Sequence, residues 1–173
     1  MEQIMSNTAL DVLTPLREGE PFPKEARDSL LRQMGVDVKW QPADQGAALP
    51  GEPKFQTLAR ARNRLKHLGT AELVLFLDNH IILPAGAVKA MVDTLQANPD
   101  QAAVGLACRS GHLKPNPPHV GLSCLLIRRS DLDEITFRAT PTVCECRFMC
   151  MDLRRRGRRI DYLPGWTAEH RTA

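Results

Sequence analysis

Asp78, Asn79 and His80 stand at the end of an apolar run, and their side chains suit the binding of a metal ion. The run, Leu73 to Leu77, is typical of a strand that is buried on both faces of a parallel sheet. Residues i and i+2 of an extended chain point the same way, so Asp78 and His80 can converge on one ion. Because open α/β sheets bind ligands just outside the carboxyl ends of their strands, this pattern predicts a metal-assisted site at a strand end.

The composition allows such a sheet to be buried. A chain of 173 residues is expected to form one domain, here residues 1–173, that buries roughly 70% of its unfolded surface. Hydrophobic residues make up 43% and charged residues 25%, which is ordinary for a globular protein. The net charge of +3 is small, and no aromatic platform accompanies the arginines, so we expect no nucleic-acid partner.

The sequence also bears on the cellular compartment. The first 13 residues contain no apolar run of signal-peptide length. No stretch approaches the ~18 consecutive apolar residues of a membrane span, so we expect no transmembrane segment. The five cysteines are an odd number without a secretory signal, which favours a reducing cytosol and a cytoplasmic location.

Candidate strands and helices alternate along the chain. The expected strands are Thr8–Thr14, Val36–Trp40, Leu73–Asp78, Ala102–Ala107, Val120–Ile127 and Arg159–Leu163. The expected helices are Lys24–Met34, Phe55–Leu68, Pro84–Ala97 and Val143–Arg156. Gln41–Pro53 and Ser110–His119 are predicted to be loops, and the residues after Leu163 a tail. The alternation predicts an α/β fold with a single, mostly parallel (mixed) sheet flanked by helices.

Short motifs follow one another in a characteristic order over nearly the whole chain. They are Thr14-Pro15-Leu16-Arg17-Glu18, Ala61-Arg62-Asn63, Asp78-Asn79-His80, Leu83-Pro84, Gly121 to Arg129, Glu145 to Gly157, and Tyr162-Leu163-Pro164 with His170. This order resembles that of the nucleotide-sugar glycosyltransferases of the GT-A fold, above all family 2. The resemblance implies a GT-A-like fold and transfer of a sugar, UDP-linked, to an unknown acceptor.

The sequence departs from the family pattern at two acidic positions. His80 replaces the second acidic residue of the Asp-x-Asp signature, and Cys146 replaces the aspartate of the Glu-Asp pair. The chain is also short for the family, which leaves little to build an acceptor site. The alternative is therefore a non-catalytic or degenerate protein that binds a nucleotide or nucleotide sugar.

A divalent cation would stabilise the charge that develops on a nucleotide diphosphate leaving group. Asp78 offers an oxygen ligand, His80 a nitrogen ligand, and the resemblance implies His170 as a further ligand. Carboxylate and imidazole together suit manganese better than magnesium. The competing interpretation is that both histidines lie on the surface without a ligand.

The resemblance also assigns residues to the nucleotide. It implies that Thr14, Pro15 and Arg17 contact the base and ribose, and that Asp44 contacts the base. Arg62 would face the nucleotide, with Asp78 and Asn79 beside it. The competing interpretation is that Arg62 is a solvated residue of a basic helix.

Glu145 is the candidate general base or acceptor-orienting carboxylate, because an inverting transfer needs a carboxylate that accepts the proton of the acceptor hydroxyl. The competing interpretation is a surface glutamate favoured by the dipole at a helix N-terminus.

Two further clusters receive structural interpretations. Cys144, Cys146 and Cys150 lack the Cys-x2-Cys spacing and a nearby fourth ligand, so they favour buried packing over a zinc site. The arginines of residues 153–159 are expected to stabilise a helix C-terminus. The alternative, which stays open, is that they contact an acidic acceptor or the phosphates of a membrane to which the protein binds peripherally.

Overall fold

The structure, a computed structural model, describes residues 8–16, 19–44, 49–108 and 119–171, and for residues 41–44 it describes the backbone alone. The strands are β1 (Thr8–Leu16), β2 (Val36–Asp44), β3 (Leu73–Leu77), β4 (Ile81–Ile82), β5 (Gln101–Ala107), β6 (Cys124–Arg128), β7 (Arg159–Thr167) and β8 (Glu169–His170). The helices are α1 (Lys24–Leu31), α2 (Lys54–Leu65), α3 (Ala87–Ala97), α4 (Arg129–Asp133) and α5 (Glu145–Arg155).

Six strands form one mixed sheet in the order β2-β1-β3-β6-β5-β7. Within it β1 runs parallel to β2 and β3, and β5 runs parallel to β7, while β6 is antiparallel to both β3 and β5. The carboxyl ends of β1, β2 and β3 therefore meet at one edge of the sheet. This is the mostly parallel, mixed sheet that the sequence predicts.

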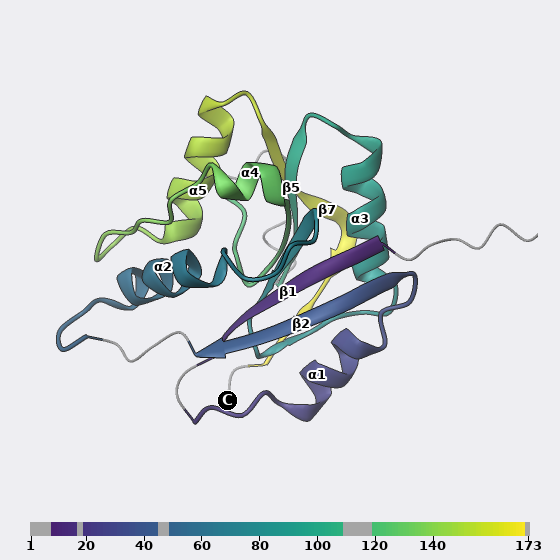
Figure 1. Cartoon of the computed structure of the whole chain (residues 1–173), viewed down its shortest axis with the longest axis horizontal. Coiled ribbons are helices and arrows are strands. Elements are labelled where there is room, and N and C mark those ends of the chain that lie inside the picture. Colours follow the sequence, from purple (N-terminus) through teal and green to yellow (C-terminus); the bar gives the residue numbers. More distant parts are fainter. Residues whose placement is uncertain (1–7, 17–18, 45–48, 109–118, 172–173) are drawn as a thin grey trace, which may run out of the picture.

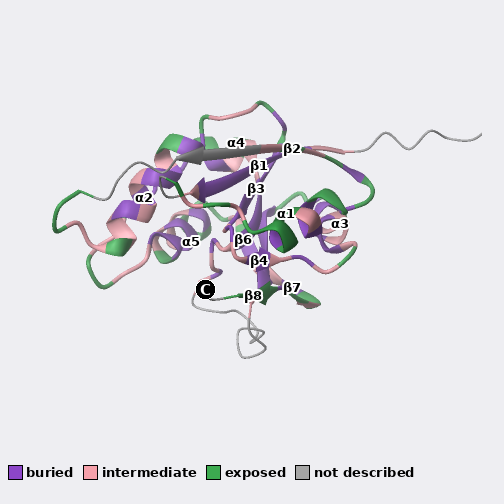
Figure 2. Cartoon of the chain, turned by 90° about the horizontal axis from the view of Figure 1, so that it is seen from below, coloured by how far each residue is buried: buried purple, intermediate pink, exposed green. Residues whose placement is uncertain are grey.

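The two faces of the sheet bury alternating side chains against different helices. Leu73, Leu75 and Leu77 of β3 pack in a cluster with α1 and α3, whereas Val74 and Phe76 pack in a second cluster with α2 and α5. Figure 1 shows α2, α4 and α5 on one side of the sheet and α1 and α3 on the other. Figure 2 shows the buried strands between helices whose outer surfaces are exposed. A continuous apolar strand such as β3 is stable here because both of its faces are covered.

The observed elements differ from the predicted ones at a few boundaries. The predicted loop Gln41–Pro53 is wrong at its start, because β2 continues to Asp44 and the Thr14–Pro42 pair still belongs to its register. Proline, which has no N–H, is tolerated there because β2 is an edge strand. The strand predicted from Val120 begins only at Cys124, and α4 was not predicted. Residues 109–118, most of the predicted Ser110–His119 loop, lie outside the described residues.

The predicted C-terminal tail is wrong over most of its length. β7 continues to Thr167, and Glu169 and His170 form β8, which pairs antiparallel with β4. The main-chain N–H of Ala168 donates to the carbonyl of Ala107, and that of Arg171 donates to the carbonyl of His80. The tail is thus tied to the segment that follows β3.

None of the helices that the structure describes has the length and apolar character needed to cross a membrane.

Candidate functional site

The chain turns directly after β3, at the first residue of the predicted metal motif. The N–H of Asp78 donates to the carbonyl of Ser123 at 2.8 Å, and the N–H of Ile81 donates back to the carbonyl of Asp78 at 3.2 Å. An i to i+3 hydrogen bond of this kind closes a β-turn over residues 78–81. The expectation that Asp78 and His80 point the same way is therefore unsupported, because it requires an extended chain.

Arg62 of α2 joins Asp78 to Glu145. Its Nη2 lies 3.4 Å from Oδ1 of Asp78, and its Nε lies 3.3 Å from Oε1 of Glu145. Arg62 is only 2% exposed, and its guanidinium lies 5.7 Å from the centre of the Phe76 ring. The interpretation of Arg62 as a solvated residue is therefore wrong, because its side chain faces the carboxyl end of β3.

The ion pairs of Arg62 leave hydrogen-bonding groups unused. Among the described residues, Nε and Nη1 of Arg62 and Oε2 of Glu145 are buried without a hydrogen-bond partner. Nε is close enough to Glu145 for an ion pair, but the two groups are not aligned as a hydrogen bond. Buried polar groups without partners are uncommon and are often found at functional sites.

Glu145 is the first residue of α5 and is 3% exposed, so it is not the surface glutamate of the competing interpretation. Burial raises the pKa of this carboxyl, and the positive charge of Arg62 opposes that rise. The negative charge of Asp78 raises the pKa further. The positive charge of Lys54 also opposes the rise in the pKa of Glu145, so two carboxylates and two cationic groups act on one another at this site.

The pairing of β4 with β8 brings the two predicted histidine ligands together. The rings of His80 and His170 have their centres 6.5 Å apart and meet edge to face. Nε2 of His80 also lies 3.5 Å from Oε1 of Glu20. A cavity of about 340 Å³ lies beside His80, between β4 and the start of α1. However, in the described part of the chain Asp78, His80 and His170 do not form a cluster with all ligand atoms within 4.8 Å of one another.

Of the residues predicted to contact the nucleoside, some lie together near the ends of β1 and β2 and others lie outside the described part of the chain. Thr14 and Pro15 are buried near the end of β1, and the hydroxyl of Thr14 accepts a hydrogen bond from the indole of Trp40 at 3.1 Å. The backbone of Asp44 pairs with that of Leu16 at the same edge, while its side chain lies outside the described part. Arg17 also lies outside the described residues.

Asn79, the remaining predicted binding residue, is 5% exposed, and its Nδ2 is buried without a hydrogen-bond partner among the described residues. The aromatic rings of Phe22 and Trp40, which no sequence motif marks, have their centres 4.8 Å apart. The hydrogen bond from the indole N–H of Trp40 to the hydroxyl of Thr14 places this pair near the predicted nucleoside position.

The arginines at the end of α5 contact carboxylates of the chain itself. Arg156 pairs with Glu134, and Arg158 pairs with Asp131, each at a shortest distance of 2.6–2.7 Å. Arg154 and Arg155 lie in the last turn of α5, where cations are favoured by the helix dipole.

Comparison with known proteins shows similarity of fold without similarity of sequence. No protein-family model matches the chain, and no curated protein does. Among solved structures, the mannosyltransferase PcManGT from Pyrobaculum calidifontis, in complex with GDP-Man and Mn2+, matches with a TM-score of 0.73 and 16% identity over 93% of this chain. This chain spans 56% of the length of that mannosyltransferase.

Two further structures show the same relationship. Glucosyl-3-phosphoglycerate synthase from Mycobacterium tuberculosis, in complex with Mg2+ and UDP, has a TM-score of 0.67 and 19% identity over 96% of this chain and 72% of its own. TarS from S. aureus, in complex with UDP-GlcNAc, has a TM-score of 0.63 and 15% identity over 95% of this chain and 59% of its own. These neighbours are GT-A-like glycosyltransferases, and the predicted GT-A-like fold is confirmed.

Proposed function

We propose that this chain binds a nucleotide sugar, UDP-linked, together with a divalent cation at the carboxyl end of β3, and transfers the sugar to an acceptor. One observation carries the proposal: a buried arginine joins the carboxylate at the end of β3 to the candidate base at the start of α5. In open α/β sheets this edge is the usual place for a ligand. The solved structures of similar fold contain GDP-Man, UDP or UDP-GlcNAc, which supports the ligand class.

The residues at the β3 edge fit a divalent cation in chemical type. The side chain of Asp78 is 27% exposed, so its carboxylate is open to an ion from outside while Arg62 holds it from inside. His80 and His170 supply two imidazoles from the adjoining turn and β8. Carboxylate and imidazole favour manganese, with magnesium the alternative, and the bound cation would neutralise the diphosphate leaving group.

The remaining residues receive roles from their positions. Glu145 would accept the proton of the acceptor hydroxyl, and Arg62 would position both Glu145 and Asp78. Asn79, next to Asp78, would contact the nucleotide through its amide, whose nitrogen is buried without a hydrogen-bond partner among the described residues. Thr14, Pro15, Arg17 and Asp44 remain the proposed contacts of the base and ribose, near the ends of β1 and β2.

A second candidate function is binding of the nucleotide sugar without transfer. The burial of Glu145 favours it, because a carboxylate that is 3% exposed and held by Arg62 must move to reach an acceptor hydroxyl. The replacement of two acidic residues of the family pattern by His80 and Cys146 also favours binding without transfer.

A panel of nucleotide sugars separates the two candidates. Enzymes that transfer a sugar also hydrolyse the donor slowly, so release of free UDP in the presence of Mn2+ should be measurable. It should fall at least about 100-fold in Glu145→Gln, since loss of a general base typically costs that much. UDP affinity should be unchanged, and the surface variant Glu134→Gln should behave as the wild type. Tight binding with hydrolysis equal to buffer alone for every donor would establish the non-catalytic binder.

A further inference from the structure

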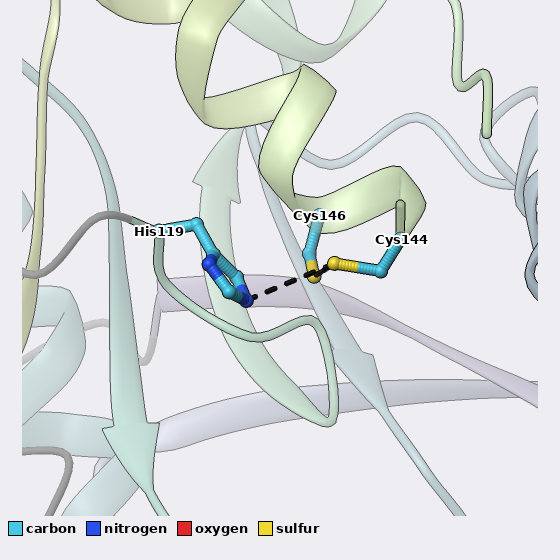
Figure 3. A group of neighbouring side chains, drawn as sticks. All are labelled: His119, Cys144 and Cys146. Atoms are coloured by element: carbon cyan, nitrogen blue, oxygen red, sulfur yellow. Dashed lines mark hydrogen bonds between the residues drawn. The ribbon is translucent and has the colours of Figure 1, made fainter. Parts of the chain in front are cut away.

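A second group of side chains that suit a metal ion lies beside α5, and it offers sulfur ligands in place of oxygen. His119, Cys144 and Cys146 converge so that Nε2 of His119 and the two Sγ atoms all lie within 4.8 Å of one another (Figure 3). Nε2 of His119 is 3.7 Å from Sγ of Cys144, and the two sulfur atoms are 2.6 Å apart. In the described part of the chain this is the one such group of three.

The backbone holds these three side chains at one place. Cys144 is the N-cap of α5, and Cys146 is in its first turn, so both sulfur atoms belong to the start of one helix. The N–H of Val120 donates to Sγ of Cys150 at 3.3 Å, and the thiol of Cys150 donates back to the carbonyl of Val120 at 3.6 Å. This pair of hydrogen bonds fixes the residue after His119 to the second turn of α5. Cys150 has its own partners and is therefore an anchor of this site rather than a ligand.

We propose that His119, Cys144 and Cys146 bind a thiophilic metal ion of the Zn2+ type, with water as the fourth ligand. Two thiolates and one neutral imidazole make a ligand set that zinc uses in proteins, and two thiolates cancel the charge of a divalent cation. The complex is then electrically neutral, which suits a site where Cys146 is buried and Cys144 and His119 are half-buried. The dipole at the N-terminus of α5 also favours negative charge at this position.

The observed distances lie close to those of a tetrahedral site. Zn–S and Zn–N bonds of usual length place a sulfur and a nitrogen ligand about 3.5 Å apart, and two sulfur ligands about 3.8 Å apart. The 3.7 Å between His119 and Cys144 meets the first requirement. The sulfur pair has to open by about 1 Å, which rotation about a Cα–Cβ bond can supply.

This site is distinct from the proposed manganese site but adjoins it in sequence. Glu145 stands between the two cysteines, and its side chain faces Arg62. A metal held by residues on both sides of Glu145 would fix the backbone from which the candidate base projects. The cysteine spacing alone favoured packing over a metal site because no further ligand stands near it in the sequence; His119 is 25 positions before Cys144.

Cobalt titration tests the proposal, because Co2+ replaces Zn2+ in such sites and absorbs light when thiolates bind it. The chain is reduced, stripped of metal with a chelator and titrated with Co2+ and then Zn2+. The expected result is one Co2+ per chain with thiolate charge-transfer absorption that one equivalent of Zn2+ abolishes. Cys144→Ser and His119→Ala should weaken Co2+ binding at least about 10-fold, while Cys108→Ser, a matched change of a half-buried cysteine outside the cluster, should leave it unchanged. Asp78→Ala should leave the thiolate charge-transfer absorption unchanged, which separates this ion from the one proposed for the nucleotide.

Circular dichroism of the metal-free variants establishes that each is folded. Absence of charge-transfer absorption in the folded, reduced wild type at tenfold excess of Co2+ would overturn the proposal. The same absorption in a folded Cys144→Ser/Cys146→Ser double variant would overturn it as well. A Cys144–Cys146 disulfide, detected by mass spectrometry, together with no Co2+ binding after reduction, would assign the close sulfur pair to a disulfide instead.

Discussion

Nε of Arg62 lies 3.3 Å from Oε1 of Glu145, and both residues are almost fully buried, at 2% and 3% exposure. This contact connects α2 to the first residue of α5. In the sequence these two helices are separated by strands β3 to β6. Because the same guanidinium also reaches Asp78, a change at the proposed cation site alters the field at the proposed base.

Replacement of Arg62 should be costly for stability. Arg62→Ala leaves Glu145 buried without its cationic neighbour, and removal of one partner from a buried ion pair typically costs about 3–5 kcal/mol. Arg64→Ala, two positions along the same helix and exposed, should change the free energy of unfolding by no more than about 0.5 kcal/mol. Urea denaturation of both variants measures the difference, and equal stabilities would show that the buried ion pair contributes nothing.

The pH dependence of donor hydrolysis should report the raised pKa of Glu145. A general base works as the carboxylate, and burial raises the pKa of this group above its usual value of 4.5. The working form is therefore lost as pH falls through a value higher than 4.5. The acid limb of kcat/KM should lie above pH 4.5 and disappear from the residual activity of Glu145→Gln. An acid limb at or below 4.5, or one that survives in Glu145→Gln, would contradict the assignment.

The C-terminal segment should contribute to the stability of the fold, whereas the imidazole of His170 should contribute to ligand binding. Deletion of residues 167–173 removes buried Ala168 and the whole of β8, so it should lower the unfolding temperature. His170→Ala keeps the backbone pairing with Ile81 and should leave stability near that of the wild type. It should nonetheless weaken UDP binding in the presence of Mn2+ by at least about tenfold, as loss of a metal-site group does. Glu169→Ala, in the same strand, is the matched control, and equal affinities of the two variants would remove His170 from the site.

Replacement of Gly69 by alanine should destabilise the fold, because the added Cβ atom would collide with Asp11. The φ of Gly69 is +76°, and a Cβ atom would lie 2.2 Å from the carboxyl carbon of Asp11. That carboxylate accepts hydrogen bonds from the N–H of Ala71 and from Arg129, each at 2.7 Å, and cannot withdraw freely.

Gly51 provides the comparison, because its φ is +74° and a Cβ there would meet nothing within 4 Å. Gly51→Ala should cost about 1–2 kcal/mol for the left-handed backbone alone. Gly69→Ala should cost about 1–3 kcal/mol more, as overpacking does. Equal losses in chemical denaturation would mean that the Asp11 contact is readily relieved.

The order of the main strands and helices could be predicted from the sequence because the relevant patterns are local. The apolar run of β3 and the helical spacing in α2 and α3 each depend on a few neighbouring residues, and the corresponding elements appear in the predicted order. The extent of β7 and the pairing of β8 with β4 were missed because they depend on contacts between distant segments. A two-residue strand such as β4 has no periodicity to detect.

The candidate site was predictable in its residues more than in its geometry. Asp78, Arg62 and Glu145 were named from motifs, and the structure brings them together. The turn at Asp78 was missed because residues 78–80 were taken as an extended chain, whereas a local hydrogen bond from the N–H of Ile81 to the carbonyl of Asp78 closes a turn there. The proximity of His119 to Cys144 and Cys146 was missed because it depends on distant segments, which the hydrogen bonds between Val120 and Cys150 hold together.

Calorimetry of UDP binding tests the central claim most directly. The wild type should bind UDP at least about tenfold more tightly with Mn2+ than with a chelator, a difference of about 1.4 kcal/mol or more. Asp78→Ala should lose this enhancement, while Asp93→Ala, an exposed aspartate on α3, should keep it. Equal UDP affinity of the wild type with Mn2+ and with the chelator would contradict a metal-dependent nucleotide site at the end of β3.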